Sequence, residues 1–580
     1  MKEADDKAPS VSHTDNPETQ DAAQAQSRDP ERTVAKSAGI ISLAVMGSRI
    51  LGLVREQVFA RYFGAGFIND AFQVGFRIPN TLRDLFAEGA LSVAFVKTFT
   101  DYQIKKGEAE AWRLAAIVMN VLAIVLGIIV ILGIVFSPQI VSLIAADFSP
   151  EKARLATTLT RIMFPFILLV ALAAVAMGVL NTKGRFGIPA SASTLFNVGS
   201  ILGGLACAYW LSGGSWALPE GANAVPGPAA QRAIIGMAIG TLIGGCLQFL
   251  IQVPSLRRVG FRFRAIVSFT DPGVRRVMRL MGPAVIGTAA VQINVLVNTF
   301  YASGISGGPS WLGYAFRLMQ FPIGVFGVAI GTATLPAISR YAARDDMQSF
   351  RSTLSSSIGL AFFLTIPSAC GLIVLGRPIV SLIYEYGAFT ATDTNMVALA
   401  LSGYAIGLAG YAVIKILSPA FYALDDARTP MLISLASIVV NVVASYYFRD
   451  LFSRYGVTPE TPYGYAHVGL ALSTSSVALI NFFALVFLMR HKVQRLDGRQ
   501  IISSLVRIAL ASAAMSAACY YVYATSAHVL GTRGVGARLL NTAIPIAVGG
   551  LIFFLMARLL RIREQEQVIG TLLGRFRRSR

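Results

Sequence analysis

Charged side chains interrupt two largely apolar stretches near the N-terminus, residues 48–56 and 76–90. An arginine or acid at the centre of a membrane span costs about 2.5–3.5 kcal/mol, so several together must face water, protein or a charged ligand. Arginine keeps its charge and can give phosphate two parallel hydrogen bonds. The stretches, with one acid between them, therefore predict a polar cavity for an anion, formed by Arg49, Arg55, Glu56, Asp70, Arg77, Arg83, Asp84 and Glu88.

A simpler interpretation puts these charges at helix ends, where long side chains reach the headgroup region. That interpretation would account for a single arginine. The number of charges in two short stretches favours the cavity.

Composition supports a membrane protein. The chain has 580 residues, of which 54% are hydrophobic and 14% are charged, whereas soluble domains carry about 25% charged residues. Repeated apolar stretches of roughly 20 residues predict an all-α polytopic membrane protein. The scattered cysteines and histidines predict neither a disulfide framework nor a metal site. The net charge of +20 lies in alternate loops and at the C-terminus, as in membrane topology, so we expect no nucleic-acid partner.

Apolar periodicity predicts fourteen spans, and the basic loops place both termini in the cytoplasm. The predicted spans are 37–60, 68–98, 114–136, 156–180, 187–211, 233–254, 278–301, 311–337, 352–375, 395–423, 430–448, 465–489, 501–525 and 540–560. The predicted organisation is a disordered cytoplasmic tail (1–35), an N-lobe of six spans (36–255), a C-lobe of six spans opening with a basic linker (256–495), spans 13 and 14 (496–563) and a basic cytoplasmic tail (564–580).

An internal repeat appears at an offset of about 240 residues. Phe76-Arg77 corresponds to Phe316-Arg317, and a polar turn leads into a proline at both Pro189 and Pro430. Parallel repeats are a transporter architecture with the substrate site between the halves. Proline and glycine inside the spans suggest hinges, although both are common in membrane helices. The hinge candidates are Gly52, Pro79 and Pro322.

These residues resemble the MurJ/MviN family of lipid II flippases, within the multidrug/oligosaccharidyl-lipid/polysaccharide exporter superfamily. The similar segments are 48–56, 63–66 with 70–72, 79–83, 86–90, 317–322 and 324–325. The resemblance implies two parallel six-helix lobes around a central cationic cavity, plus two C-terminal helices with a groove for the lipid tail.

The resemblance also implies roles for particular residues. Substrate binding falls to Arg49, Arg55, Arg83 and Arg317, with Ser48 and Asn80 beside them, while Glu56, Asp70 and Glu88 act in gating or orient the arginines. In an ideal helix Arg49 and Arg55 point about 120° apart. Either the helix bends near Gly52 or the two arginines serve different walls of the cavity.

Two departures from the family pattern matter. Phe316 stands where an acid often precedes the second-lobe arginine. Some members bind sodium through acids in spans 7 and 11, where this chain offers neutral groups, so we expect no metal site and no cofactor, and favour the membrane potential over an ion gradient as the driving force. The neutral groups are Gln292, Asn294, Asn298, Asn441 and Ser445.

The sequence thus predicts a transporter in the bacterial inner membrane, not an enzyme. Its substrate would be lipid II, undecaprenyl diphosphate bearing the disaccharide-pentapeptide, moved from the inner to the outer leaflet for peptidoglycan synthesis and cell shape. We expect a monomer in contact with the bilayer, with the cell-wall synthesis machinery as a further possible partner. Alternatives are an exporter of another polyprenyl-linked glycan or of a cationic drug, a membrane enzyme acting on prenyl phosphates, and a scaffold for cell-wall synthesis.

Overall fold

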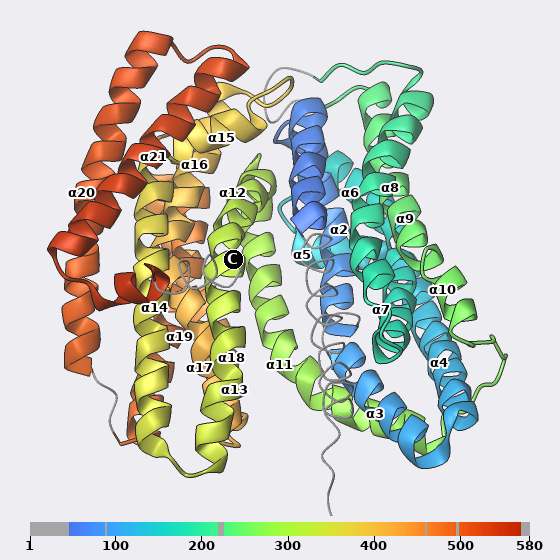
Figure 1. The fold of residues 1–580 in the computed structure, drawn as a ribbon. Coiled ribbons are helices and arrows are strands. Elements are labelled where there is room, and N and C mark those ends of the chain that lie inside the picture. The colour runs from blue at the N-terminus through green and yellow to red at the C-terminus, as the bar shows by residue number, and fades with distance from the viewer. Residues whose placement is uncertain (1–45, 87–89, 219–224, 459–460, 495–497, 570–580) are drawn as a thin grey trace, which may run out of the picture.

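A computed structural model describes residues 46–86, 90–218, 225–458, 461–494 and 498–569. The regular structure of these residues is helical throughout (Figure 1). The first helix covers residues 46–63. Then follow α2 (Phe67–Phe86), α3 (Ala90–Lys106), α4 (Glu108–Val135), α5 (Ser137–Ile144), α6 (Pro150–Met163), α7 (Phe166–Thr182), α8 (Gly187–Ser212), α9 (Pro228–Leu250), α10 (Val253–Arg258) and α11 (Pro272–Ser303). The remainder are α12 (Gly308–Pro322), the π-helical turn η1 (Ile323–Gly327), α13 (Val328–Ala343), α14 (Met347–Val374), α15 (Gly376–Tyr384), α16 (Ala391–Ile406), α17 (Leu408–Ala423), α18 (Arg428–Ser453), α19 (Ala466–Lys492), α20 (Gly498–Leu530) and α21 (Val535–Leu559).

The chain is a polytopic membrane protein. Within the described residues, ten helices are long and apolar enough to cross a bilayer, or eleven if α16 and α17, bent by 44° at their junction, form one span. The predicted second span, 68–98, takes in most of α2 and the first half of α3, and residues 87–89 between them lie outside the described residues. The count of fourteen spans remains a prediction.

Helix starts follow local signals in the sequence. Proline occupies the first turn of α6, α9 and α11, where its missing N–H is tolerated. Asp271 accepts a hydrogen bond from the Gly273 amide at the start of α11, and Thr390 and Asp393 form a capping box at α16. These caps satisfy amides that have no partner within the helix.

The order of helices repeats, as the sequence repeat predicts. The long helices α4 and α14 have 28 residues each and α8 and α18 have 26 each. In each pair the second helix begins about 240 residues after the first. Short helices follow α4 and α14 in the same order. The two halves therefore share one plan of elements.

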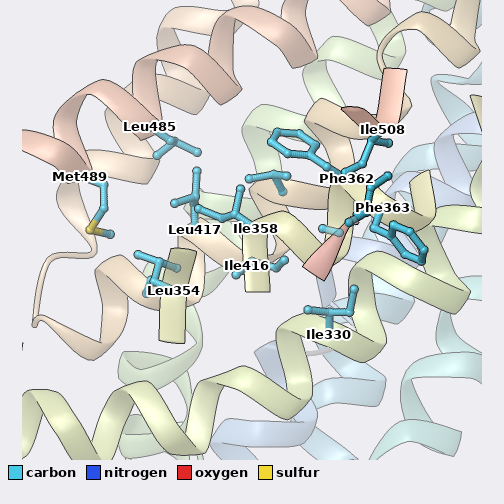
Figure 2. Packing of buried hydrophobic residues seen from close by; sticks show 14 of the residues in the cluster. Ile330, Leu354, Ile358, Phe362, Phe363, Ile416, Leu417, Leu485, Met489 and Ile508 are labelled. Carbon is cyan, nitrogen blue, oxygen red and sulfur yellow. The ribbon is translucent and has the colours of Figure 1, made fainter. Parts of the chain in front are cut away.

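The helices form two groups, with the helix over 46–63 and α2–α10 in one and α12–α21 in the other (Figure 1). Each group has its own apolar clusters. Figure 2 shows part of the cluster in the second group, where α13, α14, α17, α19 and α20 meet. Its labelled side chains are Ile330, Leu354, Ile358, Phe362, Phe363, Ile416, Leu417, Leu485, Met489 and Ile508.

Helix α11 connects the two groups. Near its start, Arg276 pairs with Asp101 of α3, and further along Gln292 donates to Asp84 of α2 (3.1 Å). Beyond that point its partners change: Asn298 donates to Thr474 of α19 (2.8 Å). The beginning of α11 is thus bound to the first group and its end to the second.

The chain after α21 begins with a short helix that packs on the second helix group. Residues 563–569 are helical, and Glu564 is only 8% exposed. Its carboxylate lies against Gly359 in the middle of α14. Gln567 donates to Ser356, one turn earlier on α14 (3.0 Å). The tail therefore packs against the second group at least to residue 567. The predicted tail at 1–35 lies outside the described residues.

Candidate functional site

Two of the arginines singled out in the sequence share one buried acid. Glu56, 3% exposed, accepts from Arg55 at 3.2 Å and from Arg317 at 3.0 Å. Glu56 belongs to the helix over 46–63 and Arg317 to α12. The acid therefore holds together two arginines that come from the two helix groups.

The arginine cluster, as we call Arg49, Arg55, Arg77, Arg83 and Arg317, has members on different walls. Arg55 lies over the Phe196 ring of α8 (5.3 Å to the centroid). The guanidinium of Arg49 instead approaches Gly324 of η1, where an added Cβ would come within 2.7 Å of it. The helix over 46–63 is continuous through Gly52. Of the two arrangements left open by helical spacing, the structure has the arginines on different walls.

The remaining arginines lie on α2. Arg83 pairs with Asp84 at 2.8 Å, and the charge of Arg83 acts on Arg55. Arg77, which we placed in the predicted cavity but not among the substrate-binding residues, interacts electrostatically with Arg317 and Asp84. Its buried Nε has no hydrogen-bond partner in the part of the chain that the structure describes. The sequence repeat was a signal for this residue, because it aligns Arg77 with Arg317.

A cavity lies at the centre of this arrangement. Its lining combines the charged groups with aromatic rings and two hydroxyls from the first helix group. Positive charge exceeds negative here, since two arginines and one carboxylate line the cavity. An anion with several oxygens is the ligand this composition suits. The lining residues are Arg55, Glu56, Phe59, Phe72, Gln73, Phe76, Ser200, Thr241 and Arg317.

Asp70 is not beside any of these arginines. Its carboxylate is fully buried and accepts from Lys152 of α6 at 2.6 Å. It also accepts from the Gly307 amide (2.9 Å) and from the Ser310 amide and hydroxyl (3.0 and 2.6 Å). Asp70 therefore caps the first turn of α12 from the opposite helix group. We call Asp70, Lys152, Gly307 and Ser310 the Asp70 cluster.

Other polar contacts between the groups lie at the same end. Asn69 donates to the Tyr314 hydroxyl at 2.8 Å. The Ala388 amide donates to the Arg61 carbonyl, also at 2.8 Å, and Arg449 lies 3.6 Å from Asp147. The two groups are thus joined beyond the arginine cluster. Sequence reasoning missed these partners, since nothing local marks them.

The other predicted residues that the structure describes make fewer charged contacts. The carbonyl of Ser48 accepts from Asn197 (3.2 Å), and Asn80 is half-buried in α2. Pro79 lies inside a continuous α2, whereas Pro322 ends α12 where the π-helical turn begins. Glu88 lies outside the described residues. Phe316 packs edge-on against Tyr404, so Arg317 finds its acid on the other helix group.

The neutral groups considered for sodium mostly bond to one another. Asn294 donates to Ser437 (3.0 Å), and the Asn441 amide donates to the Asn294 carbonyl (3.1 Å). Ser445 is hydrogen-bonded to Ser473 (2.9 Å). These bonds join α11, α18 and α19. The side-chain oxygens of Asn298 and Asn441 accept from serine hydroxyls, whereas the buried Asn294 Oδ1 has no hydrogen-bond partner among the described residues. None of these residues is a carboxylate, so the absence of a sodium site stays a prediction and we derive no step through one.

The surroundings offer little to an enzyme. His467 is buried, with its ring against the Met396 carbonyl (3.0 Å) and Trp311. Among the described residues, no group of three or more His, Cys, Asp or Glu is placed to hold a metal ion. The charged groups of the cavity are suited to binding.

Comparison with known proteins agrees with this geometry. The family model described as lipid II flippase MurJ matches residues 59–539. A probable lipid II flippase MurJ of Vibrio cholerae is 33% identical over 93% of this chain and 98% of its own length. The lipid II flippase MurJ of Burkholderia cenocepacia is 36% identical over 71% of this chain and 77% of its own.

Solved structures give the same result. A lipid II flippase MurJ in an inward closed conformation superposes with a TM-score of 0.70 at 28% identity, over 90% of this chain and 98% of that one. An inward-facing multidrug transporter of the MATE family has a TM-score of 0.59 at 16% identity, over 78% and 94% of the two chains, which shows a common fold alone. The chain therefore belongs to the MurJ family of lipid II flippases, which are transporters rather than enzymes.

Proposed function

We propose that this chain moves lipid II from the inner to the outer leaflet of the bacterial cytoplasmic membrane. The arginine cluster is the observation that carries the proposal. A diphosphate and the carboxylates of a peptide are anionic, and arginine is suited to both. In this proposal Arg55 and Arg317 bind the headgroup first, and Arg49, Arg77 and Arg83 add positive charge around it.

Glu56 would serve as a substitute for the anion while the cavity is empty. It shares its carboxylate between two arginines from opposite helix groups. An arriving diphosphate would compete for the same guanidinium groups and loosen the tie between the groups. Binding of substrate would thereby be linked to movement of one group relative to the other.

Alternating access is the transport mechanism we propose. The Asp70 cluster closes one end of the path by hydrogen bonds and an ion pair, contacts that can break and form again. Under the predicted topology, with both termini in the cytoplasm, this end faces outward. Helix α11, bound to one group at its start and to the other at its end, would bend or tilt during the exchange.

The membrane potential is the energy source we favour over an ion gradient. Moving one charge through 100 mV is worth about 2.3 kcal/mol. A cavity with an excess of arginines would respond to that field when its accessibility changes. No cofactor enters this scheme, and the protein would work as a monomer, with the cell-wall synthesis machinery as a further partner.

The sign of the charge separates this proposal from its nearest alternative. A transporter for cationic drugs would carry acids in excess of bases, contrary to the arginine cluster. A flippase for another polyprenyl-linked glycan would share the same phosphate chemistry. That alternative must be tested with the substrate itself.

The test depletes the protein in its host and measures how much lipid-linked precursor an outer-face probe can reach. Rescue is then compared for wild type, Arg55→Ala, Arg317→Ala and the control Arg454→Ala, at matched expression. Arg454 is an exposed arginine paired with Asp450 on the surface of α18. We expect wild type and the control to restore exposure and both cavity variants to fail.

Two results would count against the proposal. If all variants restore exposure, the protein flips the precursor but the arginine cluster is not its binding site. If depletion leaves exposure unchanged in a host without another flippase, the substrate is a different lipid-linked glycan.

A further inference from the structure

A second basic region lies at the beginning of α11, away from the arginine cluster. Residues 259–270, which we call the strap, join α10 to α11 without helical structure. Asn120 of α4 donates to the carbonyls of Arg264 (2.7 Å) and Ile266 (2.9 Å). Phe261 is buried and packs against Trp112. The strap is therefore held in one conformation against the first helix group.

The strap presents aromatic and basic side chains together. Phe263 is 68% exposed and Phe269 is 52% exposed, while Arg262 and Arg264 are exposed on either side of Phe263. Exposed phenylalanines are unfavourable in water, but aromatic rings and basic residues are both favoured at a membrane–water interface. This pattern places the strap at the level of the lipid headgroups.

A hollow opens where the strap meets α11. It is lined by Thr270, Pro272, Arg275, Arg276, Arg279 and Leu280. The acid Asp101 of α3 holds only one of the three arginines, Arg276.

Arg275 and Arg279 are exposed. Because they are four residues apart in a helix, they lie on one face of α11. Neither forms an ion pair with any residue that the structure describes. The start of the helix adds the positive end of its dipole. The one acid of this turn, Asp271, is engaged as the helix cap.

We propose that this hollow binds the phosphate headgroup of an anionic glycerophospholipid. Arg275 and Arg279 would hold the phosphate, while the exposed Phe263, Phe269 and Met278 would lie among the acyl chains. Basic pockets of this kind on the cytoplasmic side of membrane proteins recognise anionic lipids. A soluble phosphate compound or a nucleic acid would leave the aromatic side chains without a partner.

This site is separate from the proposed transport site. Helix α11 reaches the arginine cluster at Gln292, which donates to Asp84 beside Arg83, and the hollow around Arg275 and Arg279 lies about 20–25 Å earlier along the helix at 1.5 Å per residue. In Figure 1, α11 begins next to α3, at the opposite end of the molecule from the first turn of α12. Under the predicted topology the lipid belongs to the cytoplasmic leaflet. The inference does not depend on which substrate is transported.

The test measures binding of dihexanoyl phosphatidylglycerol to the full-length protein in detergent, with dihexanoyl phosphatidylcholine and inorganic phosphate as comparison ligands. The variant is Arg275→Gln with Arg279→Gln. The matched control is Arg340→Gln with Arg344→Gln, two exposed arginines four residues apart at the end of α13. Each basic residue near an anionic membrane surface contributes about 1 kcal/mol, so the variant should bind phosphatidylglycerol about 30-fold more weakly.

The proposal is supported if phosphatidylglycerol binds more tightly than the other two ligands and only the α11 variant weakens it. Equal weakening by the α13 control would show general attraction to a basic protein and overturn the site. Equal binding of inorganic phosphate would overturn the lipid as its occupant. Tighter binding of undecaprenyl diphosphate than of phosphatidylglycerol would likewise assign the hollow to the transported lipid and overturn the proposal.

Discussion

The Asp70 cluster and the arginine cluster both place buried charges between the two helix groups, but they are neutralised to different degrees. Asp70 receives four hydrogen bonds, including one from the lysine that balances its charge. Glu56 must serve both Arg55 and Arg317, and the buried Nε of Arg77 has no hydrogen-bond partner among the described residues.

The difference indicates different roles. A buried charge that is fully matched is strongly destabilising to disrupt, because removing one partner leaves the other uncompensated. A buried group with excess charge of one sign gains stability when a ligand of opposite charge arrives. We interpret the Asp70 cluster as a contact that closes one end and the arginine cluster as a site that awaits its anion.

The largest effect on stability should come from Asp70→Asn. The substitution leaves Lys152 buried without its counter-charge, which costs about 3–5 kcal/mol. We expect a clear fall in the unfolding temperature of the purified protein, partly recovered by adding Lys152→Met. Asp147→Asn is the control, because its pair with Arg449 is half-exposed and 3.6 Å long, and such pairs contribute about 0–1 kcal/mol. Equal losses in the two variants would remove the distinction between the clusters.

Arg317→Gln should impair transport more than stability. Glu56 keeps Arg55 as its partner in this variant, so the unfolding temperature should change little. Loss of a hydrogen bond to a charged group is worth about 1.5–3 kcal/mol, or a roughly ten- to hundredfold loss in precursor flipped. Glu56→Gln should have the opposite pattern to Arg317→Gln. It leaves two arginines without their acid, so it should lower the unfolding temperature. A stable Glu56→Gln protein would contradict this account of the arginine cluster.

A smaller effect is expected from Gly64→Ala, which tests the closed end without changing charge. Gly64 has a φ of +61°, and a Cβ there would lie 2.6 Å from the Ala388 carbonyl oxygen of the other group. Gly107→Ala is the matched control, since Gly107 has a φ of +86° with open space around it. Both variants bear the cost of a left-handed residue. The additional clash should make the Gly64→Ala protein less stable than the Gly107→Ala protein by about 1 kcal/mol or more. Equal unfolding temperatures would show that the backbone at Ala388 shifts to accept the Cβ without cost.

The smallest effect concerns a loop distant from both clusters. The Lys492 ammonium, 2.8 Å away, and the Thr429 amide lower the pKa of Asp426 to about 2. A carboxyl group with a lowered pKa stabilises the fold above its unfolded pKa of about 3.9, and that contribution is lost as the pH falls through about 2. Asp426→Asn should therefore cost up to about 1 kcal/mol at neutral pH, because it removes a partly exposed ion pair with Lys492. Unfolding temperatures of the two proteins should converge between about pH 4 and pH 2, and a constant difference would contradict the role of the charge.

The sequence predicted the membrane class, the repeat and the chemistry of the cavity. Apolar length identifies spans because a helix must cross about 30 Å of hydrocarbon. Arg55, Arg83 and Arg317 stand out because charge is expensive in such helices.

The sequence by itself determined which residues carry charge inside the membrane, because that signal depends only on residue type and local hydropathy. Only the tertiary structure decided how these charges are matched. Asp70 and Lys152 are far apart in the chain, and Ser310 is further still, so their contact follows from how helices pack. Gly324 beside Arg49, and Glu56 between Arg55 and Arg317, likewise depend on the approach of two helix groups. Contacts between residues so far apart in the chain leave no local pattern in the sequence. For this reason the sequence predicted the arginines but not the residues that pair with them.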